Sequence, residues 1–82
     1  MQTEVWGQPG IEGDSIVIRV CVDRCDIVSV FISDWAFTRT EHPDPAASAA
    51  ATETAREWLR QHREEAHLWY GELELARKRK SK

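Results

Sequence analysis

The fold is decided by two runs of β-branched residues, SIVIRVCV at positions 15–22 and DIVSVFIS at positions 26–33, joined by the polar triplet DRC. Valine and isoleucine favour extended backbone, and a short polar connection between two such runs is typical of a β-hairpin. Apolar residues recur at every second position in each run, which places them on one face of a strand. The sequence therefore predicts an antiparallel hairpin with one continuous apolar face.

The register of this hairpin follows from the positions of the apolar residues. Those at even positions share a sheet face only if paired positions sum to an even number, and a two-residue turn would give odd sums. We therefore expect a connection of three or five residues around Arg24, with Ile18 near Val30. The opposite face is half apolar and would be covered by Trp6, Trp35 or a partner. Its residues are Val17, Arg19, Cys21, Ile27, Ser29 and Phe31.

The segments on either side of the hairpin are less regular. Residues 1–14 contain three glycines and a proline, which favour turns, so we expect no long element there and at most a short edge strand at 3–6. After the second strand the large residues shift to Trp35 and Phe37, which predicts a bulge or bend near Asp34.

A helix is predicted from Pro45, with Asp44 as its N-cap, because the carboxylate accepts from free backbone N–H groups and proline has no N–H to leave unpaired. Strong helix formers continue to Lys80, with Gly71 as the single glycine. Residues of this segment repeat in alternating steps of four and three, as in a packed helical seam. They are Ala55, Leu59, His62, Ala66, Trp69, Leu73 and Ala76.

A single helix of this length would extend past the hairpin. At 1.5 Å per residue it would span about 52 Å, against about 27 Å for an eight-residue strand. The apolar half beyond the hairpin would then be exposed to water. We therefore expect the helix either to break near His62 or Gly71 or to pack on a second copy, and we predict a homodimer through the long helix.

Together these elements predict an α+β fold: an N-terminal antiparallel β-hairpin or small three-stranded sheet, followed by one long C-terminal helix, continuous or broken. The chain of 82 residues is short enough for one domain. The predicted parts are a turn-rich segment at 1–14, the hairpin at 15–38, the helix at 45–80 and a basic tail at 77–82. No apolar run is long enough for a membrane span and no leader precedes the domain, which predicts a complete cytoplasmic protein.

The sequence contains no motif for catalysis, a cofactor or a metal. Cys21 and Cys25 are two cysteines in a Cys-x3-Cys pair, wider than most zinc-binding pairs, so free thiols are expected ahead of a hairpin disulfide. His62 and His67 lie five positions apart and do not share a helix face. We therefore expect a protein that is not an enzyme and holds neither cofactor nor metal.

Charge is divided unequally along the chain. Residues 1–76 hold six arginines against all fourteen acidic residues, a net charge of −8, and the last six residues hold five basic ones. An acidic body suits a basic protein partner. The alternative is a nucleic-acid-binding regulator that uses Arg77, Lys78, Arg79 and Lys80, together with helix arginines. Those arginines are Arg56, Arg60 and Arg63, which are interleaved with glutamates.

The favoured interpretation is a small interaction module that binds and modulates, or inhibits, a larger protein. Four tryptophans in a chain of this length are many, and tryptophan is a frequent anchor at interfaces. The body contains arginine but no lysine and is rich in alanine, which suggests a GC-rich bacterial or phage genome. A small, acidic, single-domain chain is a common form of phage or mobile-element accessory protein, by analogy of composition alone. The partner-binding residues predicted are Trp69, Tyr70, Leu73, Trp58 and Trp35.

Overall fold

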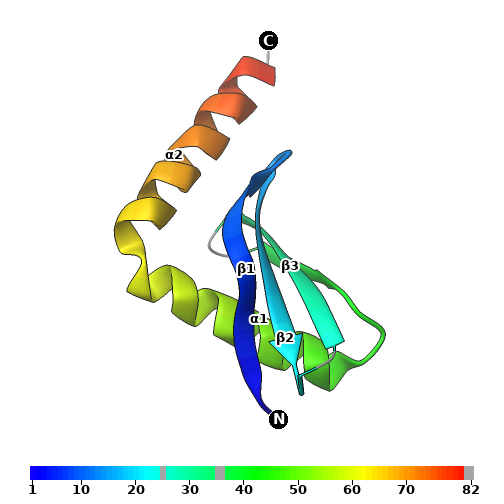
Figure 1. The fold of residues 1–82 in the computed structure, drawn as a ribbon. Helices are drawn as coiled ribbons and strands as arrows, with labels where there is room; N and C mark the ends of the chain where they lie inside the picture. Colours follow the sequence, from blue (N-terminus) through cyan, green and yellow to red (C-terminus); the bar gives the residue numbers. More distant parts are fainter. Residues whose placement is uncertain (25, 35–36, 81–82) are drawn as a thin grey trace.

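The structure, a computed structural model, describes residues 1–24, 26–34 and 37–80. It contains a four-stranded antiparallel sheet in the order β1-β2-β3-β4, followed by two helices (Figure 1). The predicted α+β class is confirmed, but the sheet has one strand more than expected and the helix is in two pieces. The elements are β1 (Thr3–Glu12), β2 (Ser15–Val22), β3 (Asp26–Asp34), β4 (Phe37–Glu41), α1 (Pro45–Gln61) and α2 (Arg63–Lys80).

The β2–β3 hairpin has the predicted register. Ile18 pairs with Val30 and Val22 with Asp26, so three residues connect the two strands. Within this connection Asp23 and Arg24 have φ angles of 51° and 73°, in the left-handed region. The apolar residues at even-numbered positions of both strands are buried, with at most 2% of each residue exposed. They are Ile16, Ile18, Val20, Val22, Val28, Val30 and Ile32.

The expectation of only a short strand at the N-terminus is wrong. β1 runs for ten residues, and a bulge absorbs the turn-forming residues within it. Trp6 pairs with Arg19 and Gly10 with Val17, so three residues of β1 lie opposite the single residue Ile18. A positive φ of 73° at Gly7 provides the bend of this bulge.

The sheet continues into a fourth strand, which the sequence prediction did not include. The register shift that we expected near Asp34 is present between Ile32 and Asp34. β4 then pairs antiparallel with β3, with Arg39 opposite Phe31. Trp35, one of the predicted partner-binding residues, lies outside the residues that the structure describes.

Helix α1 begins as predicted and packs on the sheet. Oδ1 of Asp44 accepts a hydrogen bond of 3.0 Å from the backbone N–H of Ala46, which caps the helix in front of Pro45. The buried residues recur at every fourth position and are mostly small, so the helix backbone approaches the sheet closely. They are Ala47, Ala51, Ala55 and Leu59.

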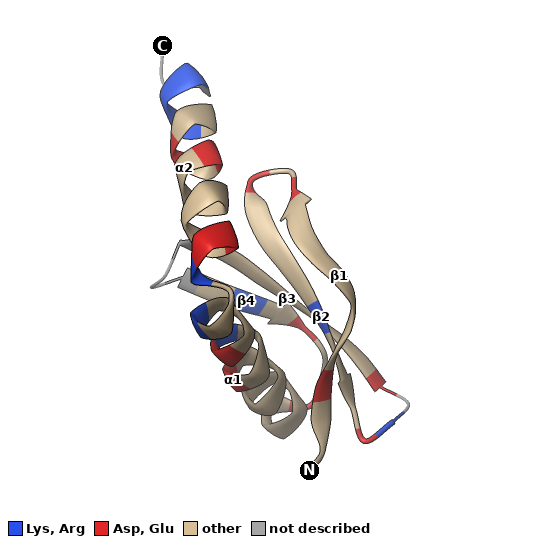
Figure 2. Ribbon diagram, turned by 60° about the vertical axis from the view of Figure 1, so that its left-hand side comes forward, with Lys and Arg blue, Asp and Glu red and all other residues tan. Residues whose placement is uncertain are grey.

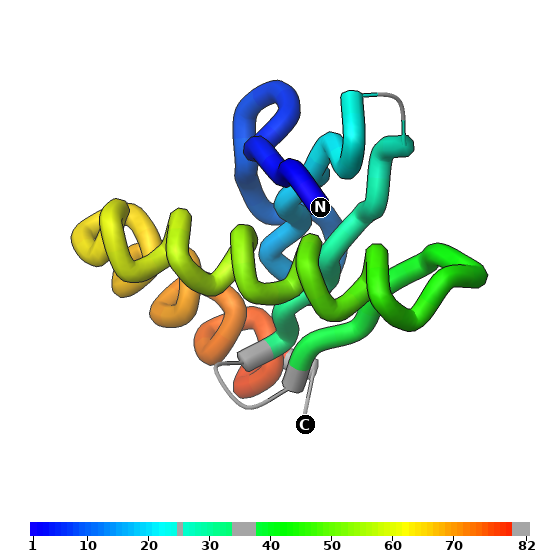
Figure 3. The backbone as a smooth tube through the Cα atoms, turned by 90° about the horizontal axis from the view of Figure 1, so that it is seen from below, coloured from blue at the N-terminus to red at the C-terminus, as the bar shows by residue number. Residues whose placement is uncertain are grey.

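The helical segment breaks at His62, one of the two predicted points, while Gly71 lies inside α2. His62 has a φ of −119° and a ψ of 53°, and its backbone N–H donates to the Trp58 carbonyl at 3.0 Å. The chain turns sharply here, so α2 lies at an angle to α1 (Figures 1 and 3). Ala66 and Leu73 of α2 join the core that α1 and the sheet form. The second helix therefore packs within the chain rather than continuing as a straight apolar overhang.

Candidate protein-interaction surface

The sheet has an inner face, which packs on the helices, and an outer face, which we call the open face. The buried residues of both helices belong to the core on the inner face, and the described part of the chain places neither helix on the open face (Figure 2). The residues that the register pairs on the open face are Glu4, Trp6, Gly10, Glu12, Ser15, Val17, Arg19, Cys21, Ile27, Ser29, Phe31, Arg39 and Glu41.

Among the sheet residues whose burial the structure describes, the most exposed apolar ones lie at one end of the open face. Trp6 of β1 is 55% exposed and Ile27 of β3 is 40% exposed. With Cys21 of β2 between these strands, they line a half-open hollow of about 700 Å³, whose wall also includes Glu4 and Arg24. An aromatic and aliphatic floor with charged groups beside it is the usual composition of a protein-binding patch.

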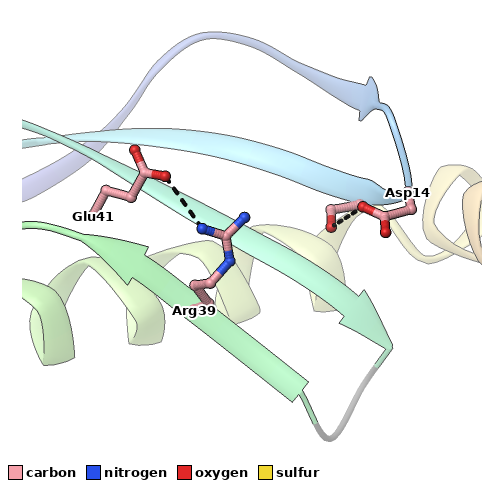
Figure 4. A network of polar contacts seen from close by, with 4 residues as sticks. Asp14, Arg39 and Glu41 are labelled. Carbon is pink, nitrogen blue, oxygen red and sulfur yellow. Dashed lines mark hydrogen bonds and ion pairs between the residues drawn. The ribbon is translucent and has the colours of Figure 1, made fainter.

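The other half of the open face carries balanced charge. The Arg39 guanidinium lies 4.3 Å from the centre of the Phe31 ring. It also lies 3.2 Å from a Glu41 carboxylate oxygen, as Figure 4 shows. Arg19 forms a similar exposed ion pair of 3.1 Å with Glu12. Because each of these arginines already faces a carboxylate, this surface lacks the single positive sign that a phosphate backbone requires.

The predicted partner-binding aromatic residues lie mainly against one another at the junction of the helices. The Trp58 ring stacks on Trp69 at 5.7 Å between ring centres and on His62 at 3.9 Å. Tyr70 is half-buried against the core, and Leu73 is only 3% exposed. Leu73 is therefore a core residue of this chain, while Trp58, Trp69 and Tyr70 present only part of their surface. The sequence could not reveal this stack because it depends on the angle of the break.

Two leucines of α2 are the apolar residues that this helix does expose. Leu68 is 69% exposed and Leu75 is 55% exposed, and their spacing of seven places them on the same side of the helix. Leu68 was missed by the sequence analysis because it lies outside the apolar seam. The signal in the sequence was that Leu68 directly precedes Trp69, which belongs to the seam.

The basic residues at the C-terminus continue helix α2 as far as Lys80. The Arg77 guanidinium donates to the backbone carbonyl of Ser33, at the end of β3. Lys78 forms an exposed i, i+4 ion pair of 3.8 Å with a glutamate one turn earlier, and Arg79 is exposed. Since Arg77 ties α2 to the sheet, the predicted basic tail is in part a structural contact.

Two of the three helix arginines, Arg60 and Arg63, lie near each other beside the break between the helices. Arg60 donates to Glu57 at 2.9 Å, an ion pair that the interleaved glutamates make possible on this part of α1. With Arg63 and His67 it lines a separate hollow of about 370 Å³ between the two helices, on the side of Tyr70.

Nothing in the described part of the chain gathers three or more histidine, cysteine or acidic side chains in a way that would hold a metal ion. His42 accepts from the Asp44 N–H at Nδ1, and its Nε2 lies 3.6 Å from an Asp26 oxygen. His62 donates from Nδ1 to the Trp58 carbonyl, at 2.8 Å. Both histidines have structural contacts, and Cys21 is a half-buried free thiol on the open face. Cys25 lies outside the described residues.

Comparisons with known proteins leave this geometry as the basis of any functional argument. No family model matches the sequence, and neither the curated proteins nor the solved structures contain a significant match. Of the helices in the described residues, none combines the length and apolar character needed to cross a membrane.

Proposed function

We propose that this chain is a small protein-interaction module that binds a larger protein and modulates its activity, with the open face of the sheet as the contact surface. The observation that carries the proposal is the exposed Trp6, which with Ile27 and Cys21 borders the hollow of about 700 Å³. A solvent-exposed tryptophan in a concave patch that also carries polar and charged groups is a strong candidate for an interface anchor.

This proposal changes the predicted location of the contact from α2 to the sheet. Leu73 is buried in the core of the chain, and Trp58 and Trp69 stack on each other. Trp6 has no comparable ring contact among the described residues, so a partner would gain most from covering it. Inhibition of the larger protein is the most concrete form of modulation for a module of this size, since covering a surface is sufficient for it.

The test is affinity capture from cells of the source organism with the tagged wild-type chain and the Trp6→Ala and Ile27→Ser variants. Truncation of a central anchor costs about 2 kcal/mol or more, equivalent to a loss of affinity of about thirtyfold. A specific partner should therefore be depleted by either substitution. The Leu75→Ala variant, which removes an equally exposed residue from α2, should capture it normally. Capture that all three variants retain would refute the open face as the contact.

The nucleic-acid alternative makes a distinct prediction. DNA or RNA retention that weakens steeply with salt and disappears when residues 77–82 are removed would favour it. The pairing of Arg39 with Glu41, of Arg60 with Glu57 and of Lys78 with its neighbouring glutamate weighs against this alternative.

A further inference from the structure

We infer that the free edge of β1, together with the groove between β1 and α1, binds an extended basic segment of the partner by strand addition. This inference rests on the proposed function, because it specifies how a partner protein is bound. The element that carries it is the first part of β1, from Thr3 to Trp6, before the bulge. β1 is an outermost strand of the sheet, and no described strand pairs with its second edge (Figure 1).

The hydrogen-bond pattern shows which backbone groups this edge offers. Asp23 donates its backbone N–H to the Gln2 carbonyl at 2.9 Å, and these residues lie directly opposite each other in the register that continues into β1. Antiparallel pairs alternate between hydrogen-bonded and non-hydrogen-bonded. Glu4 therefore bonds to β2, while the N–H and C=O groups of Thr3 and Val5 point away from the sheet. An added strand would meet two donors and two acceptors.

Space for such a strand exists beside these groups. A groove of about 430 Å³ runs between the edge and α1, and its lining includes Thr3, Val5 and Trp58. The Thr3 hydroxyl lies 2.5 Å from the Thr54 hydroxyl of α1, which holds the edge at a fixed distance from the helix. A segment that adds to β1 would therefore lie in a shallow groove beside α1 and not only along an open edge.

The charges around the groove indicate which kind of peptide segment would bind there. Glu53 and Glu57 of α1 line the groove, and Glu4 lies on the opposite side of the same strand. Side chains of an added strand alternate between the two faces, so lysine or arginine would meet a carboxylate on either face. Glu57 is shared with Arg60, whereas Glu53 has no ion pair among the described residues. A second copy of this chain would instead bring the same carboxylates to the interface, and like charges disfavour pairing.

The net charge of the chain also favours a basic partner. Residues 1–76 carry a net charge of −8, which attracts a basic segment from a distance and speeds its association. Backbone hydrogen bonds would provide affinity and the carboxylates would provide selectivity, as in other cases of strand addition. The bulge that follows Trp6 limits the pairing to about four residues of β1.

The test uses the full chain and two synthetic heptapeptides, one alternating lysine with valine and one alternating glutamate with valine. We expect only the lysine peptide to bind, and NMR titration would measure the binding of each peptide. Near saturation, amide exchange at Thr3 and Val5 should slow by about tenfold, because these N–H groups become hydrogen-bonded. Exchange at Glu4, which already bonds to β2, should change little. Binding of neither peptide, or equal binding of both, would overturn the inference.

Two pairs of variants separate strand addition from general attraction. Val5→Pro removes an outward N–H, so the lysine peptide should bind about tenfold more weakly than to Val5→Ala, which loses the same packing but keeps the N–H. Glu53→Gln should weaken binding, while Glu65→Gln, which removes an exposed carboxylate from α2, should have little effect. Circular dichroism would verify that each variant is folded. If Val5→Pro is unfolded, the comparison of Glu53→Gln with Glu65→Gln tests the inference. Equal binding by both members of each pair would contradict the inference.

Failure here and failure of the proposed function would look different. If Trp6→Ala abolishes capture of a partner and Val5→Pro and Glu53→Gln do not, the open face binds and the edge does not. That result would reject the strand-addition inference and leave the interaction module intact.

Discussion

Leu73 and Leu75 are two residues apart on α2 and have opposite environments. Leu73 is 3% exposed and belongs to the core, while Leu75 is 55% exposed. A helix with these exposures packs on the rest of the chain along one side. The alternation of steps in the seam identified Leu73 as an apolar contact, but the sequence did not indicate whether the contact was to this chain or to another.

Substitution of each of these two leucines tests whether α2 packs on the core. Leu73→Ala should lower the free energy of unfolding by about 2–5 kcal/mol, because it leaves a cavity in the core. Leu75→Ala should change it by less than about 0.5 kcal/mol, since it removes an exposed side chain. Urea denaturation of both variants is the measurement. Similar, small effects of the two substitutions would mean that α2 does not pack on the core.

At the scale of elements, the β2–β3 hairpin and the start of α1 followed from sequence because each depends on neighbouring residues. The parity of the apolar positions and a three-residue connection fix the register, and Asp44 followed by Pro45 fixes the helix start. β1 was truncated in the prediction because Gly7 and Pro9 were interpreted as turn residues, whereas the chain uses them within a bulge. Local composition does not distinguish these uses, since the paired strand decides between them.

The N-cap of α1 should make a measurable contribution to the stability of the fold. The Asp44 carboxylate accepts from the Ala46 N–H at 3.0 Å, so Asp44→Ala should destabilise the fold by about 1 kcal/mol. Asp44→Asn retains an accepting oxygen and should lose much less. Thermal unfolding of the two variants checks this, with a lower melting temperature expected for the alanine variant. Equal melting temperatures would show that the cap contributes nothing to stability.

At the scale of the whole molecule, the sequence predicted a two-faced sheet with a half-apolar second face but did not identify Trp6 as an exposed residue of that face. Trp6 was considered as a cover for that face, and the structure makes it part of the face. The packing at the helix junction could not be predicted from the sequence either, because the stacking of Trp58 on Trp69 depends on the angle between the helices at His62. Such features arise where elements meet, and a single sequence carries no direct record of those contacts.

The burial of the helical seam also bears on the predicted homodimer. That prediction assumed an apolar overhang, but Leu59, Ala66 and Leu73 are buried within one chain. The apolar side chains that remain exposed on α2 are too few for an extensive helix–helix interface, since Leu68 and Leu75 lie seven positions apart with Glu72 between them. We therefore expect a monomer in solution, with a mass near 9.4 kDa by light scattering over a range of concentrations.

A mass of twice that value would contradict the monomer, and two variants would then locate the contact. Dissociation by Leu68→Ser would assign it to α2 and restore the helix-mediated homodimer. Dissociation by Trp6→Ala would assign it to the open face, because that substitution removes the largest exposed side chain of the sheet and leaves α2 unchanged. In that case self-association would compete with binding of a partner. Capture of the partner should then weaken as the concentration of the module rises, which the same affinity experiment would detect.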